Sequence, residues 1–335
     1  RYGYQYGVND NQKKILKLPH DYQYKDGEPN ETVKARTVFG KHIREHRDRT
    51  KLREDFANWL TADEHPFFAA NIVNRLWNRA FGFPLIDGLN TITQGDKLIK
   101  SKNDELLRYL ITVIKKVNYD TKNFNRILLN TRFYQSEADA EGKFRGPALR
   151  RMTAPQFWDS LVTLHVGDPD GWQPKRYDEE YSKVFSDLAE MDAATVVKKH
   201  NEYNSLNRKY YDGAPKLGSL LAIRSSHVFE NSKNANFLIE FGRSDRELIQ
   251  NGDTDGNITQ ILVLMNSPLA STLGSKISFA MKKAQSAPKE KSLEILFYSF
   301  LGRMPTATEK KALADAYLYD IVWVLLNSHE MKLIT

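Results

Sequence analysis

Apolar residues recur along most of the chain with the 3.6-residue period of amphipathic helices. In PFFAANIVNRLWNRAFG (66–82), this spacing is followed by Ala69, Ile72, Val73, Leu76, Trp77 and Ala80. A proline in the first turn and a glycine at position 82 are typical of the start and the end of a helix. The pattern therefore predicts a helix that begins near Pro66 and stops at Gly82.

Similar stripes predict helices over most of the remaining chain. We expect them over 44–60, 103–117, 258–266, 269–283, 291–301, 306–318 and 320–330, and over a segment that Thr121 caps. TAPQ (153–156) is a capping box with proline in the first turn, so another helix begins there. Only LLAIRSS, within 211–236, suggests a strand. The predicted fold class is mainly α, an irregular multi-helix domain with long loops and little β.

Helix-breaking glycine and proline residues, together with a change in composition, divide the chain into two parts. Residues 1–40 are polar and rich in tyrosine, with Gly27, Pro29 and Gly40 as breakers, so we expect an extended arm or linker from a preceding domain. Residues 41–335 are expected to form the mainly helical domain. The charged stretch 177–210 predicts one or two helices, which would form a helical-hairpin insertion.

Composition is that of a folded protein with a sizeable core. The chain has 335 residues, 41% of them hydrophobic, and a net charge of +7. Its densest basic run, Lys41–Arg53, is interrupted by Glu45 and Asp48, which indicates an exposed, salt-bridged helix face. No nucleic-acid-binding motif accompanies the charge, so an acidic polysaccharide is the anionic partner considered and nucleic acid is not expected. No apolar run reaches the roughly 18 residues of a transmembrane segment.

Metal and cofactor sites receive little support. The chain has no cysteine, which excludes thiolate zinc sites, iron–sulfur clusters and covalent haem within it. His42 and His46 are spaced like metal ligands on a helix, but the face around them is basic. DTDGN (253–257) resembles the start of a calcium loop, without the glutamate that should follow. We expect no metal site and no cofactor within this chain.

The polar face of the 66–82 helix is the first candidate site. It carries Asn71, Asn74, Arg75, Asn78 and Arg79. Asparagine and arginine make several directed hydrogen bonds, so these side chains could bind an anionic or hydroxylated ligand. The same groups can instead satisfy buried backbone carbonyls and tie loops to the helix. The scaffolding role is favoured, with Asn74 and Arg75 kept as ligand-binding candidates.

Catalytic residues are harder to name. The chain has no nucleophile elbow and no phosphate-binding loop. Asp159 and Asp245 are the acids in the most structured polar surroundings and are weak catalytic candidates. If the protein acts on an acidic polysaccharide, Arg75, Arg150 or Arg151, and Arg246 should converge on the ligand beside one of these carboxylates.

Several segments, in order, resemble one known family. They are LPHDYQYKDGEPNETVKARTVFG (18–40), FANWLTADEHPFFAANIVNRLWNRAFGFPLID (56–87), NDELLRYLITVIKKVNYDTKNFNRILLNTRFYQ (103–135), GPALRRMTAPQFWDSLVTL (146–164), ANFLIEFGRSDRELIQN (235–251), ITQILVLMNSP (258–268), FLGRMPTATE (300–309) and DIVWVLLNSHE (320–330). This order resembles the domain of unknown function 1553, abundant in planctomycetes and verrucomicrobia. The family normally has a longer segment between the last two motifs, which indicates that residues are missing near Ala314–Tyr319.

The resemblance implies a setting but no reaction. Members usually follow a companion domain, 1549, and sometimes a c-type cytochrome domain, in large exported proteins. The chain, which begins with Arg1, is thus expected to be part of a longer extracytoplasmic protein, periplasmic or at the cell surface. Three functions are considered. The first is a non-catalytic structural module that docks with companion domains, sister chains or other envelope proteins in an oligomer or larger complex. The second is a hydrolase or lyase acting on sulfated or acidic polysaccharide. The third is an electron-transfer scaffold with haem on another domain.

Overall fold

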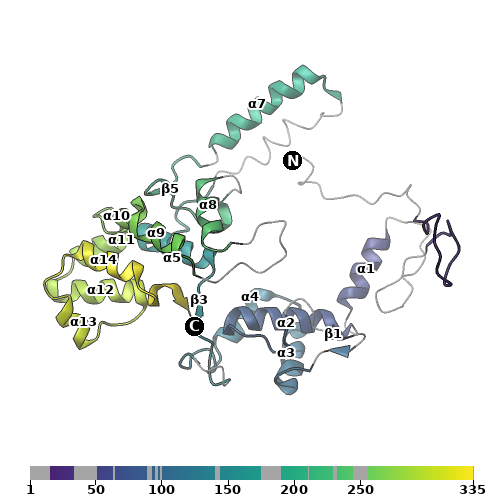
Figure 1. Ribbon diagram of the computed structural model, residues 1–335, viewed down its shortest axis with the longest axis horizontal. Coiled ribbons are helices and arrows are strands. Elements are labelled where there is room, and N and C mark those ends of the chain that lie inside the picture. Colours follow the sequence, from purple (N-terminus) through teal and green to yellow (C-terminus); the bar gives the residue numbers. More distant parts are fainter. Residues whose placement is uncertain are drawn as a thin grey trace. The chain divides into compact units, whose positions relative to one another are not determined.

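The protein is seen here as a computed structural model, which divides the chain into two compact units, Arg1–Leu149 (unit 1) and Arg150–Ile334 (unit 2) (Figure 1). Residues 16–33, 51–62, 65–88, 93–94, 97–98, 100–139, 144–174, 190–209, 211–228, 232–243 and 256–334 are described. Helices dominate these ranges, and the strands in them are two residues long, which confirms the predicted mainly α class. The sequence pattern placed 41–335 in one domain, whereas each unit has a hydrophobic core of its own.

Unit 1 is built on a small group of helices. Its described elements are α1 (Leu52–Thr61), α2 (Pro66–Phe81), β1 (Thr93–Gln94), β2 (Lys97–Leu98), α3 (Asp104–Lys116) and α4 (Thr121–Leu129). Helix α2 packs against α3 and α4. It begins with His65, whose Nδ1 accepts a hydrogen bond from Phe68 N at 3.3 Å, and ends at Gly82 with φ +83°. The predicted stop at Gly82 is therefore confirmed. A helix end with left-handed backbone conformation favours glycine, which has no Cβ atom.

The core of unit 1 is rich in aromatic side chains. Trp77 of α2 is buried, and its ring stacks on Phe133 and Phe144 with centroids 5.8 and 6.1 Å apart. Phe81 packs on Trp77 at 4.0 Å. The cap of helix α4 lies one residue earlier than predicted, because Asp120 rather than Thr121 accepts the hydrogen bond from Asn123 N.

Unit 2 contains more helices. Its described elements are β3 (Arg150–Arg151), α5 (Ala154–Val166), α7 (Ala193–Lys209), β4 (Lys216–Leu217), β5 (Leu220–Leu221), η4 (Ser225–His227), α8 (Lys233–Glu240), α9 (Ile258–Asn266), α10 (Pro268–Leu273), α11 (Phe279–Gln285), α12 (Lys289–Leu301), α13 (Ala307–Ala312), α14 (Leu318–Asn327), η5 (Glu330–Lys332) and β6 (Leu333–Ile334).

The core of unit 2 forms around α5 and the last helices. Both halves of the predicted capping box between Thr153 and Gln156 are present at the start of α5. Trp158 is fully buried, and its Nε1–H donates to the Ile223 carbonyl at 2.8 Å. Helices α11, α12 and α14 pack side by side in sequence order, α11 on α12 and α12 on α14. Strands β3 and β6 pair antiparallel, so the start of unit 2 is joined to its end.

Two predicted segments differ from the structure, and a third is only partly described. The expected helix 269–283 is interrupted between α10 and α11, where the buried Ser278 hydroxyl donates to the Leu164 carbonyl at 3.0 Å. The expected helix 306–318 ends at Ala312, and the residues to Tyr317 form a turn and a short link to α14, in the region where missing residues are predicted. Of the hairpin predicted over 177–210, α7 forms the second half, and 177–189 lie outside the described residues.

Part of the predicted arm is described. Residues 16–33 contain no helix, and an antiparallel bridge joins Lys17 to Thr32. Backbone hydrogen bonds from Leu18 N to Glu31 O and from Val33 N to Leu16 O extend this pairing. Within the described ranges, no helix combines the length and apolar character needed to cross a bilayer.

Candidate functional site

Asn74, the first ligand-binding candidate, is a structural clamp. It is fully buried on α2, and its amide binds both backbone groups of Ile86: Nδ2 donates to the carbonyl at 3.0 Å, and Oδ1 accepts from the N–H at 2.9 Å. Because a buried backbone group without a partner is costly, this clamp holds the loop that follows α2. The structure thus supports the scaffolding interpretation at this position.

Arg75, the next residue, lies on the exposed side of α2. Its Nε donates to Asn71 Oδ1 at 3.0 Å, one helical turn away. Neighbours at this spacing stabilise a helix by a few tenths of a kcal/mol, about 0.2–0.5. Arg75 therefore does not share the buried environment of Asn74.

Unit 2 repeats the asparagine clamp, which the sequence analysis did not single out. Asn234 of α8 is buried, its Nδ2 donates to the Leu221 carbonyl at 2.7 Å, and its Oδ1 accepts from the Leu221 N–H at 3.1 Å. This amide holds strand β5 against α8. An asparagine among the apolar positions of NANFLIE was the signal that could have pointed to it.

Asp159, the first catalytic candidate, also makes intramolecular contacts. Its Oδ1 accepts from the Ser225 N–H at 2.7 Å and its Oδ2 from the Ser225 hydroxyl at 3.0 Å, so the carboxylate holds the start of η4. An Arg224 Nη atom lies 3.8 Å from Oδ2. Arg224 donates hydrogen bonds to both carboxylate oxygens of Asp170, at 2.8 and 2.6 Å. The hydrogen bonds from Arg224 lower the pKa of Asp170, and Asp170 in turn raises the pKa of Arg224.

Arg150 and Arg151 form strand β3. Arg151 Nη2 donates to Oε1 of the buried Gln260 at 2.6 Å, and Gln260 Nε2 donates to the Glu240 carbonyl at 3.0 Å. Lys332 lines the same small hollow as Arg151. Burial, and secondarily the charge of Arg151, lowers the pKa of Lys332. Arg151 therefore belongs to a network that joins β3, α8 and α9.

The other candidates are only partly placed. Asp245, Arg246, His42 and His46 lie outside the described residues. Arg75 belongs to unit 1, whereas Arg150, Arg151 and Asp159 belong to unit 2. At the end of the DTDGN motif, Asn257 Oδ1 accepts from Gln260 N at 2.8 Å and so caps α9. In the described part of the chain, no group of three or more His, Asp or Glu residues is arranged to hold a metal ion.

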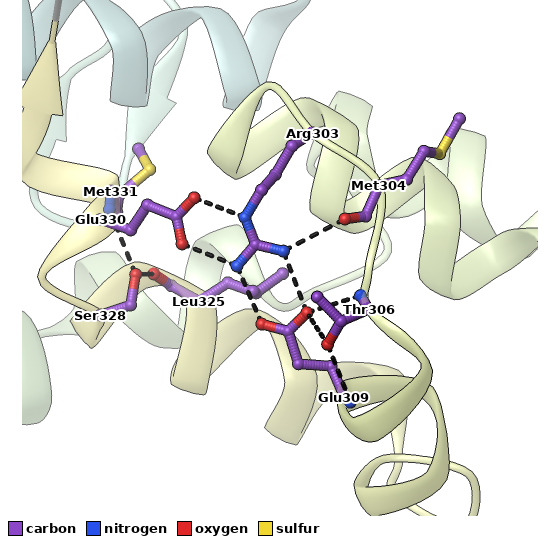
Figure 2. A network of polar contacts seen from close by, with 8 residues as sticks. All are labelled: Arg303, Met304, Thr306, Glu309, Leu325, Ser328, Glu330 and Met331. Atoms are coloured by element: carbon purple, nitrogen blue, oxygen red, sulfur yellow. Dashed lines mark hydrogen bonds and ion pairs between the residues drawn. The ribbon is translucent and has the colours of Figure 1, made fainter. Parts of the chain in front are cut away.

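The FLGRMPTATE motif forms a charge network (Figure 2). Arg303 donates two hydrogen bonds to Glu309, at 2.9 and 2.8 Å, and two to Glu330. Glu309 also accepts from the N–H and hydroxyl of Thr306, in a capping box at the start of α13. Hydrogen bonds from Arg303 first, and Thr306 second, lower the pKa of Glu309 from 4.5 to about 2. The spacing of Thr306 and Glu309 signals the capping box, but not the approach of Glu330.

Helix α9 has apolar residues on two opposite faces. Leu264 packs in the core and Gln260 is buried beside it. The other face carries an apolar stripe at i, i+3, i+4 and i+7, the α9 stripe: Ile258 is 75% exposed, Ile261 45%, Leu262 51% and Met265 39%. A helix that is apolar all round is normally buried, and contiguous exposed apolar residues mark interaction surfaces.

A groove lies beside α9. It has a volume of about 300 Å³. Phe237 of α8, Val263 of α9 and Leu269 of α10 line it, together with Leu217 and Leu220 of the β4–β5 hairpin. Its size is at the lower end of the range of ligand-binding cavities, roughly 300–1,000 Å³.

These features define a mainly α-helical protein whose polar side chains tie loops to helices, with an exposed apolar surface on unit 2. The chain belongs to the PSD1 family, described as protein of unknown function (DUF1553), whose model matches residues 52–317. This match confirms the resemblance seen in the sequence motifs. No curated protein and no solved structure matches the chain.

Proposed function

We propose that this chain is a non-catalytic binding and structural module of a large exported cell-envelope protein. It docks with companion domains of the same parent protein or with sister chains in a surface assembly. The setting is extracytoplasmic, and any c-type haem of the assembly would lie on a separate domain or partner.

The observation that carries this proposal is the exposed α9 stripe. Four neighbouring aliphatic side chains in contact with water are unfavourable, because burial of apolar surface contributes about 25 cal/mol per Å². Helix α9 has no charged residue, so no charge on it has to stay in contact with water. A partner that covers the stripe removes this cost, which supports a docking role.

The candidate catalytic and ligand-binding residues also favour a docking role over catalysis. A general acid or base must reach the substrate with a carboxyl oxygen or its proton. Both oxygens of Asp159 instead accept hydrogen bonds from Ser225, and the nitrogen and the oxygen of the buried Asn74 amide are both bonded to Ile86. We therefore prefer the docking module over the hydrolase or lyase acting on acidic polysaccharide.

Site-specific photo-crosslinking in the native cell tests this proposal. The crosslinking amino acid replaces Leu262, on the α9 stripe, in the full-length parent protein. Its control replaces Tyr298, which is 64% exposed on α12. We expect a discrete adduct at position 262, identified by mass spectrometry as a companion domain or a second copy, and none at position 298. The absence of an adduct at 262, or adducts with unrelated abundant proteins at both positions, would contradict the proposal.

A further inference from the structure

We infer that the groove between α8, α9, α10 and the β4–β5 hairpin binds an apolar peptide segment that carries a positive charge, which Glu240 receives. This inference rests on the proposed docking function, because it names the chemistry of the segment that docks. It is drawn from the lining of the groove and from the partners of Glu240.

The lining determines the apolar character of the segment. Six of the ten described residues that line the groove are apolar. Among them, Leu217 is fully buried and Phe237 is 7% exposed, so the walls are continuous with the core of unit 2. A volume of about 300 Å³ has room for one or two aliphatic side chains, whose burial would drive binding.

Glu240 determines the sign of the charge that the bound segment should carry. Among the described residues that line the groove, it is the only ionisable one. None of the ion pairs between described residues involves its carboxylate. A carboxylate beside apolar walls interacts strongly with an opposite charge, because water screens the interaction less there. A lysine or arginine next to apolar residues in the partner therefore complements this groove, and an acidic segment does not.

The groove is held in shape before any partner arrives. Asn234 fixes Leu221 to α8, and Gln260 fixes the Glu240 carbonyl to α9. At Gly218, with φ +62°, the hairpin approaches α10 so closely that a Cβ atom would lie 3.1 Å from the Pro268 carbonyl carbon. Preorganised walls lower the cost of ordering on binding, so a small groove can still select its ligand.

Octylammonium and octanoate probe this chemistry directly, because they share an alkyl chain and differ in the sign of the head group. Calorimetric titration of the full chain should show octylammonium binding at least tenfold more tightly than octanoate. Glu240→Gln should weaken octylammonium binding about tenfold, as expected for loss of a charged partner. The matched control is Glu202→Gln on α7, an exposed glutamate outside the groove, which should leave binding unchanged.

Circular dichroism and the thermal midpoint show whether Glu240→Gln folds. We expect that it does, because the hydrogen bond that holds this residue in the fold is made by its main-chain carbonyl and not by its side chain. Equal affinity for the two probes, or unchanged octylammonium binding by Glu240→Gln, would overturn the inference.

The crosslinking assay separates this inference from the docking function. Glu240→Lys, combined with the crosslinker at Leu262, should reduce the adduct by at least fivefold. If the adduct keeps its full yield, docking stands and the role of Glu240 fails. If no adduct forms but octylammonium binding depends on Glu240, docking fails and the charge selectivity of the groove stands.

Discussion

Both units of this protein hold a non-helical segment with one buried asparagine, but they surround it differently. Asn74 binds Ile86 within the aromatic core of unit 1, and Asn234 binds Leu221 within the more aliphatic core of unit 2. A primary amide suits this role because it donates and accepts side by side, as a backbone does. One side chain thus satisfies both polar groups of a loop residue.

The two units differ in how much charged side chains contribute to their stability. The core of unit 1 is organised by rings around Trp77, whose packing does not depend on pH. Unit 2 adds a guanidinium held by two carboxylates, which depends on ionisation. The Arg303 network should therefore add to unit 2 a pH dependence in the acidic range that the ring packing of unit 1 does not have.

The largest effect is expected from the asparagine clamps. Asn74→Ala leaves the N–H and carbonyl of Ile86 without partners in the core, so unit 1 should lose about 3 kcal/mol of unfolding free energy. Asn234→Ala should cost unit 2 about 2 kcal/mol, because Leu221 is only partly buried. Urea unfolding followed by hydrogen exchange with mass spectrometry identifies which unit opens.

Asn71→Ala, on the same helix as Asn74, is the matched control and should change stability by less than about 0.5 kcal/mol. A loss below about 1 kcal/mol in Asn74→Ala would show that the clamp contributes little. Destabilisation of both units by either clamp variant would contradict the separation into two cores.

A smaller effect, dependent on pH, is expected at the Arg303 network. The folded pKa of Glu309 is about 2, below its ordinary value of 4.5, so its stabilisation is present above pH 4.5 and is lost as the pH falls toward 2. Arg303→Ala should cost about 1–2 kcal/mol at neutral pH, since the side chains are partly exposed and water screens the pairs.

Thermal midpoints recorded between pH 5 and pH 2 measure this contribution. Glu309→Gln should flatten the pH dependence of unit 2, whereas Asn74→Ala should leave that dependence as in the wild type. Equal slopes in the wild type and in Glu309→Gln would show that the network does not control acid stability.

The smallest effect is expected at Arg75. Its side chain is exposed, and its hydrogen bond to Asn71 joins neighbours on one helix, so Arg75→Ala should lower the free energy of unfolding by less than about 0.5 kcal/mol. Chemical denaturation of the variant beside Asn74→Ala measures the contrast between adjacent residues. A loss above about 1 kcal/mol would place Arg75 among the structural ties.

Helical periodicity determined the fold class and most helix positions, because burial of one face repeats locally. It located α2 with its stop at Gly82, and the capping box of Thr153 located α5. Periodicity failed where a residue made a contact with a segment distant in sequence. At the break between α10 and α11, Ser278 binds the Leu164 carbonyl, more than a hundred residues away in sequence. Periodicity also could not show that the chain divides after Leu149.

The candidate residues show the same limit. The sequence alone determined that Asn74 and Asp159 carry hydrogen-bonding groups in helical segments, and that the chain has the motifs of its family. Only the tertiary structure decided that these groups bind Ile86 and Ser225, that Glu330 joins Arg303, and that the α9 stripe faces solvent. Residue types and spacing define local helix faces, whereas the partner of each face is chosen by packing between segments distant in sequence.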